Sequence, residues 1–106
     1  MAQYLIVAWD GTDPQARERR LAARPAHLAG VAPMTETGQM MIGGAMLDEA
    51  GEMVGSACVV EFDTRAELDR WLATDPYVTG GVWRKIEVHP MRVAVQAAPR
   101  MAARTA

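Results

Sequence analysis

The chain has 106 residues, half of them hydrophobic, one cysteine (Cys58) and a formal net charge of −2. This length and apolar content predict one folded domain with one core and argue against intrinsic disorder. The charge provides no basic field for nucleic acid, and no apolar stretch reaches the length of a membrane span. A single cysteine forms neither an intrachain disulfide nor a CxxC metal motif. Because the fold then needs no disulfide, a cytoplasmic location is expected.

The N-terminal segment predicts a strand followed by a helix. Residues 4–9 (YLIVAW) are β-branched and aromatic and end at the turn DGTDP, which is typical of a buried strand. Asp13 precedes Pro14, and a carboxylate at that position can accept the unpaired amide hydrogens of a first helical turn. A helix is therefore expected over residues 14–23.

Two prolines bear on the rest of this helix. Pro25 lacks an amide hydrogen and clashes with the preceding turn, so it is expected to interrupt or kink the helix. The helical segment is then expected to end before Pro33. Its predicted apolar face consists of Leu21, Leu28 and Val31.

The middle of the chain predicts a hairpin. Residues 40–47 and 53–62 are apolar runs joined by DEAGE, a turn sequence. The first run contains Gly43 and Gly44 in its interior. Glycine in a strand loses packing and usually marks a bulge or a close approach by another group.

The last third predicts a second helix and a fourth strand. Thr64 and Glu67 have the spacing of a capping box at a helix start. TDPYVTGG ends this helix, and residues 82–89 read as a strand, with a second extended piece expected after Pro90. The apolar stripe of the helix consists of Leu68, Trp71 and Leu72.

The order β-α-β-β-α-β predicts a ferredoxin-like α+β fold, with a four-stranded antiparallel sheet and both helices on one face. The other sheet face must then meet water, a ligand or a second copy of the chain. Because monomers seldom expose large apolar patches, a homodimer packed sheet to sheet is expected. We assign residues 1–96 to the domain and residues 97–106 to a flexible C-terminal tail.

Only two histidines are present. His89 precedes Pro90 at the end of the last strand, where a solvent-facing ring is expected. His27, in RPAHLAG, has three interpretations: a packed core ring, a metal ligand or a proton carrier. The absence of HxH, HExxH or clustered cysteines argues against a metal. Since a lone helical histidine beside leucine is more often packed than functional, a functional His27 requires a partner.

Asp75 is the candidate partner. It follows a helix end in TDPYV, and Pro76 restricts its backbone to extended or turn geometry. A carboxylate against one imidazole nitrogen fixes the tautomer and leaves the other nitrogen to act as acid or base. The alternative is an ordinary turn residue. Arg24 lies one helical turn before His27 and is interpreted either as a ligand for an anionic group or as a solvated arginine.

The segments RPAHL, GGAML, GSACVVEF and TDPYVTGGVW, followed by IEVHP, resemble the YCII-related (YciI-like) family in order and spacing. The resemblance covers residues 4–93 and implies a ferredoxin-like fold among the dimeric α+β barrels, relatives of muconolactone isomerase. It names no substrate. Relatives include a dehydrochlorinase acting on a chlorinated hydroxyquinol, so the resemblance implies a fold that can support proton-transfer chemistry.

In this family a histidine and an aspartate lie at the centre of a cleft, and the resemblance places them at His27 and Asp75. It further implies ligand-binding positions at Arg24, Ser56 and Gly43.

Gly44 departs from the family, which commonly has proline there. Losing proline frees φ and restores an amide donor, so a softer loop is expected.

These residues support two main hypotheses about function. The first is a cofactor-independent, metal-free enzyme in which His27, oriented by Asp75, performs acid/base chemistry of the isomerase, lactone or elimination type. Arg24, Ser56 and the amides of residues 43–44 would bind oxygens of a small-molecule substrate. The alternative is a non-catalytic metabolite-binding or accessory module, and a third reading is a purely structural dimer.

Overall fold

The four predicted strands form one antiparallel sheet in the computed structural model, which describes residues 1–97. The elements are β1 Ala2–Asp10, α1 Ala16–Thr37, β2 Met40–Leu47, β3 Met53–Phe62, α2 Arg65–Thr74, α3 Pro76–Thr79 and β4 Trp83–Met91. The strand order is β2-β3-β1-β4, so one strand separates the two strands that each long helix connects. This arrangement confirms the ferredoxin-like α+β fold. Of the predicted tail, all but residue 97 lies outside the described residues.

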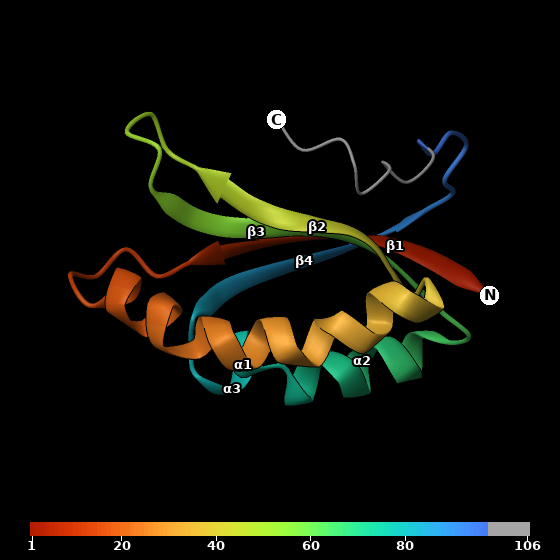
Figure 1. The fold of residues 1–106 in the computed structure, drawn as a ribbon, viewed down its shortest axis with the longest axis horizontal. Coiled ribbons are helices and arrows are strands. Elements are labelled where there is room, and N and C mark those ends of the chain that lie inside the picture. Colours follow the sequence, from red (N-terminus) through yellow and green to blue (C-terminus); the bar gives the residue numbers. More distant parts are fainter. Residues whose placement is uncertain (98–106) are drawn as a thin grey trace, which may run out of the picture.

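All three helices cover the same face of the sheet, and the other face carries none of them (Figure 1). Successive side chains of a strand point to opposite faces. In β1, Tyr4, Ile6 and Ala8 are therefore buried under the helices, while the residues between them are more exposed. β3 shows the same alternation, and its helix-facing side contributes both core residues and a polar side chain, Ser56.

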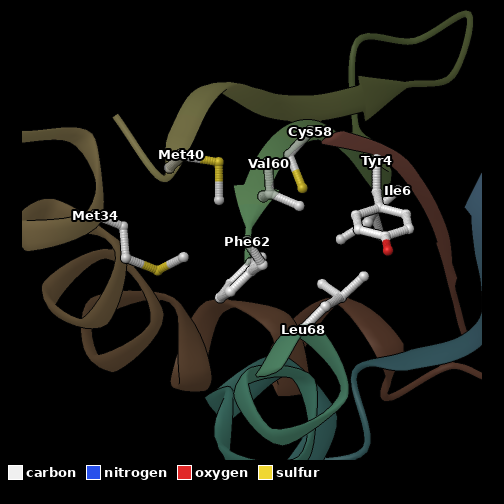
Figure 2. Packing of buried hydrophobic residues seen from close by; sticks show 8 residues of the cluster. All are labelled: Tyr4, Ile6, Met34, Met40, Cys58, Val60, Phe62 and Leu68. Atoms are coloured by element: carbon white, nitrogen blue, oxygen red, sulfur yellow. The ribbon is translucent and has the colours of Figure 1, made fainter. Parts of the chain in front are cut away.

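The main core lies between the sheet and the two longer helices (Figure 2). Leu68 of α2 has no exposed surface, and Trp71 and Leu72 pack against the same cluster, as the predicted stripe requires. Full burial of such side chains stabilises the fold by about 1.5–3 kcal/mol each. The buried cluster consists of Tyr4, Ile6, Met34, Met40, Cys58, Val60, Phe62 and Leu68.

The predicted start of α1 is wrong. The first helical residue is Ala16, and the position before it, Gln15, makes no side-chain cap. The carboxylate of Asp13 instead accepts two hydrogen bonds from the guanidinium of Arg19, at 2.7 and 3.0 Å. This pairing lowers the pKa of Asp13 to about 2. The Asp13 carboxylate therefore binds Arg19 through both of its oxygens and does not cap the helix.

The predicted interruption of α1 at Pro25 and its end before Pro33 are also wrong. The helix continues through both prolines to Thr37, although each proline removes one backbone hydrogen bond. It ends at Gly38, whose φ of 83° lies in the left-handed region that favours glycine. The packing of one long helix along the sheet outweighs the two missing bonds.

The buried stripe of α1 differs from the predicted face. Leu21 and Leu28 are exposed, whereas Val31 packs at the edge of the core. The buried residues of the helix are Ala16, Arg20 and Met34. The middle of this stripe is therefore polar, and it faces the cavity described below.

The second half of the chain follows the prediction closely. The hydroxyl oxygen of Thr64 accepts the backbone N–H of Glu67 at 3.2 Å, which confirms the cap of α2. The hairpin strands have the predicted bounds. β4 continues through Pro90 to Met91 without a break, which an edge strand permits because one of its sides has no strand to pair with.

Candidate functional site

A histidine and an aspartate 48 residues apart meet beneath the sheet. His27 projects from the middle of α1, and Asp75 connects α2 to α3. The Nδ1 atom of His27 lies 2.9 Å from Oδ1 and 3.0 Å from Oδ2 of Asp75. The carboxylate is 2% exposed and the imidazole 14% exposed. The predicted pairing is therefore present, with the ring on the accessible side.

The sequence around Asp75 explains why its carboxylate is held still. Asp75 caps α3, and its Oδ1 accepts the backbone N–H of Tyr77 at 2.8 Å. Pro76 occupies the first helical position, where its missing N–H costs nothing. The same oxygen therefore serves the helix cap and the imidazole. An Asp-Pro turn at this point is both structural and a support for the histidine.

Aromatic contacts fix the plane of the His27 ring. The ring of Tyr77 stacks on it with centroids 3.9 Å apart and an interplanar angle of 13°, and Trp83 meets it edge-on at 5.9 Å. Because a carboxylate only accepts hydrogen bonds, Nδ1 carries the hydrogen and donates it to Asp75. In the neutral ring Nε2 is then an unprotonated acceptor, which is the form that a general base requires.

Next to this pair lies a buried polar network, of which only Ser56 was predicted from the sequence. Arg20 is 3% exposed, and its Nη1 donates to both carboxylate oxygens of Asp10 at 3.0 Å. Its Nη2 donates to the Ser56 hydroxyl oxygen at 2.9 Å, and the indole Nε1 of Trp83 donates to the same oxygen at 3.1 Å. The guanidinium also lies 4.8 Å from the centre of the Tyr77 ring. The network thus joins Ser56 to the aromatic residues around His27.

The two groups of residues share one cavity of about 320 Å³. Every site residue predicted from the sequence lines it except Asp75, which lies behind the imidazole. The cavity wall is mainly apolar, and its charged side chains are two arginines. The predicted residues that line the cavity are Arg24, His27, Gly43, Gly44 and Ser56.

The two glycines of β2 have different surroundings. A Cβ atom at Gly43 would lie 3.3 Å from the Met40 sulfur and 3.4 Å from the Cys58 Cβ, so a side chain there would crowd the helix-facing side of the sheet. A Cβ atom at Gly44 would meet nothing within 4 Å. Of the two, only Gly43 is thus a position where an added side chain would meet close neighbours.

Two ionisable groups of the cavity stay protonated at neutral pH. Burial raises the pKa of the Cys58 thiol to about 12, and the Asp75 charge contributes to the rise. Burial also raises the pKa of the Tyr77 hydroxyl. Because a thiol is a poor nucleophile compared with its thiolate, Cys58 is not suited to covalent chemistry. His27 is left as the group best suited to proton transfer.

His89 has no part in this site. Its ring is largely exposed on β4, as predicted, and its Nε2 lies 3.1 Å from Oε1 of Glu87. Within residues 1–97, no group of three or more His, Cys, Asp or Glu side chains is arranged to hold a metal ion. None of the helices in this part of the chain combines the length and the apolar character needed to cross a membrane.

The fold and the cavity define a class: small ferredoxin-like α+β proteins with a histidine–aspartate pair at a cavity under one sheet. The sequence model of the YCII-related domain matches residues 2–92. The protein YciI of Escherichia coli O6:H1 is 34% identical over 95 residues, which cover 84% of this chain and 95% of that protein. The chain belongs to the YCII-related family.

Solved structures agree with this fold. The 5-chloro-2-hydroxyhydroquinone dehydrochlorinase of Burkholderia phenoliruptrix AC1100, in complex with 2,5-dihydroxybenzoquinone, superposes with a TM-score of 0.75 at 23% identity, over 87% of this chain and 95% of that one. A dimeric ferredoxin-like protein of unknown function from Jannaschia sp. CCS1 gives a TM-score of 0.51 at 18% identity, over 88% and 100%. At these identities the likeness concerns the fold.

Proposed function

We propose that this protein is a cofactor-independent enzyme that uses His27 as a general base and acid on a small oxygen-bearing molecule. The observation that carries the proposal is the contact of 2.9 Å between Nδ1 of His27 and Asp75, beside an open cavity. Asp75 is the positioning residue, because it holds the tautomer that leaves Nε2 as the base. Arg24, Ser56 and the amides of residues 43–44 bind the oxygens of the substrate.

The proposed reaction begins with transfer of a proton from an acidic C–H or O–H group to Nε2. The electron pair left behind moves onto a conjugated oxygen of the substrate, where Arg24 and Ser56 stabilise the negative charge. The protonated ring then returns its proton to another atom, which gives an isomerisation. Alternatively, the electron pair returns from the oxygen to form a carbon–carbon double bond, the leaving group departs with the electrons of its own bond to carbon, and the ring passes its proton to solvent, which gives an elimination. Elimination is the chemistry named for the Burkholderia dehydrochlorinase, which shares the fold.

Two copies of the chain are proposed to pack through their uncovered sheet faces. Ile42, Val59 and Leu5 lie side by side across β2, β3 and β1 and form an apolar row on that face. Ile42 is 68% exposed in the single chain. A second copy would cover this row, and the Jannaschia protein with the same fold is described as dimeric.

The test of the proposed function uses conjugated hydroxyketones such as 2,5-dihydroxybenzoquinone and its chlorinated precursors, followed by NMR in D₂O. Wild-type protein is expected to exchange or convert them. His27→Gln should lower the rate by about 10²- to 10⁴-fold while still binding them. His89→Gln is the matched control and should have the wild-type rate. Equal rates in wild type and His27→Gln reject the base, and binding without turnover by wild type favours the metabolite-binding alternative.

A further inference from the structure

The hydroxyl of Ser56 has one remaining hydrogen-bonding capacity. A serine oxygen can accept two hydrogen bonds and donate one. Both acceptor positions are occupied, because Nη2 of Arg20 and Nε1 of Trp83 can only donate, at 2.9 and 3.1 Å. The hydroxyl hydrogen has no acceptor among the protein groups of residues 1–97. Ser56 is 8% exposed and lines the cavity, so this hydrogen is available to a ligand there.

The orientation of Ser56 is fixed from behind. Arg20 cannot turn away, because its Nη1 donates to both carboxylate oxygens of Asp10, and both side chains are 5% exposed or less. Trp83 is held by its edge contacts with Tyr77 and His27. Two cationic or polar N–H groups pointing at one oxygen also draw electron density from its O–H bond, which strengthens the hydroxyl as a donor. A mobile serine could alternate between donor and acceptor, whereas this one cannot.

We propose that Ser56 is a dedicated hydrogen-bond donor to an oxyanion, and that Arg20 and Trp83 are the positioning residues that hold it in this role. The inference rests on the proposed function and specifies its substrate class. Arg24, which forms no ion pair with an acidic side chain in residues 1–97, supplies positive charge on the same cavity. His27 supplies the acceptor Nε2. The ligand that satisfies all three groups carries an enolate or phenolate oxygen and an acidic hydrogen.

The probe for this proposal is 4-nitrophenolate, whose visible absorption band moves to shorter wavelength when its phenolate oxygen accepts a hydrogen bond. Wild-type protein is expected to bind it and shift the band. Ser56→Ala should reduce the shift and weaken binding by about 10- to 100-fold, the range for a hydrogen bond to a charged group. Ser56→Cys serves as a second variant in case Ser56→Ala is unstable, because a thiol donates poorly but still accepts weakly.

Thr35 offers a matched control. It lines the same cavity, but its hydroxyl already donates to the carbonyl oxygen of Ala32 at 2.6 Å. Thr35→Val should therefore keep both the affinity and the band shift. Trp83→Phe tests positioning: it frees one acceptor site on Ser56, and the band shift should shrink even where the melting temperature is unchanged.

The outcomes separate this proposal from the proposed function. No binding of 4-nitrophenolate by wild type at millimolar concentration, or a Ser56→Ala protein that binds and shifts the band like wild type, overturns the donor role. If turnover of hydroxyketones is nevertheless lost in His27→Gln, the proposed function stands without it. If the Ser56-dependent shift is found but His27→Gln turns over at the wild-type rate, the donor role stands and the base is rejected.

Discussion

Asp75→Asn keeps the oxygen that caps α3 and removes the negative charge that faces His27. In the wild-type protein the backbone nitrogen of Tyr77 lies 2.8 Å from Oδ1 of Asp75. The amide oxygen of asparagine can still accept this N–H, so the cap of α3 is retained. The amide nitrogen then replaces Oδ2, which lies 3.0 Å from Nδ1 of His27. Nδ1 would then face one N–H donor, and the uncharged amide oxygen at the Oδ1 position, 2.9 Å away, would be its one remaining acceptor on this side chain. We therefore expect the preference for a hydrogen on Nδ1 to weaken, so that part of the imidazole rings carry it on Nε2.

The size of the effect follows from the burial of the pair. With the carboxylate 2% and the imidazole 14% exposed, solvent screens their contact little. A hydrogen bond to a charged group contributes about 1.5–3 kcal/mol. At about 1.4 kcal/mol per tenfold change, Asp75 favours the Nδ1–H tautomer by about 10- to 100-fold. Losing most of this preference lowers the fraction of rings that have an unprotonated Nε2, so turnover should fall by no more than about 10- to 100-fold.

The assay is ¹⁵N NMR of the imidazole nitrogens, at a pH where both rings are neutral. Wild-type His27 should show an unprotonated Nε2, and Asp75→Asn should show a larger share of the tautomer whose Nδ1 is unprotonated. His89, exposed on β4, is the internal reference and should be the same in both proteins. Asp75→Ala should lose about 0.5–2 kcal/mol more stability than Asp75→Asn because it removes the cap. An Nε2–H tautomer in wild type, or no change in the variant, refutes the reasoning.

Other substitutions test the fold and the assembly. Gly30→Ala should raise the free energy of unfolding by about 0.5–1 kcal/mol, since a Cβ there meets nothing inside α1. Gly38→Ala should lower the free energy of unfolding by about 1–2 kcal/mol, because the φ of 83° at this position disfavours a residue with a side chain. Urea unfolding measures both changes, and a change of the same sign in the two variants contradicts these predictions. The Cys58 thiol, with its pKa raised from 9.0 to about 12, should react with a disulfide reagent at pH 9 at least about 100-fold slower than a free thiol. The stability that this thiol contributes is complete below pH 9 and is lost as pH rises through about 12, a loss that Cys58→Ala should not show. Ile42→Glu should sediment as a monomer, whereas the control Leu21→Glu, which adds the same charge on α1, should remain a dimer. If both variants sediment as dimers, the proposed interface is wrong.

The strands could be predicted well because local signals bracket them. The bounds of β2 and β3 are those expected, since the DEAGE turn and the apolar runs on either side define a hairpin without reference to the rest of the chain. α1 could not be predicted in the same way. Pro25 and Pro33 are correct local signals for breaks, but contacts of the helix with the sheet and with α3 outweigh them.

The site was partly predictable for the same reason. His27 and Asp75 belong to short segments that name a family, and the structure brings them together. Arg20 gave no such signal, because in ARERRLAAR it looks like one of several solvated arginines. The usable clue was its spacing: Arg20, Arg24 and His27 recur at intervals of four and three residues, which places them on one side of a helix.

That spacing also explains why α1 has so weak an apolar face. Ala16 and Met34, near the two ends of the helix, pack in the interior as a surface helix normally would. Between them the buried side carries Arg20 and His27, because a cavity rather than the core lies beneath that stretch. Burying a guanidinium is costly unless it is paired and hydrogen-bonded, and Asp10 supplies the pairing here. An apolar residue at position 20 would pack at lower cost, but it could not hold the Ser56 oxygen. The polar interruption of the helix is therefore best explained by the cavity it lines.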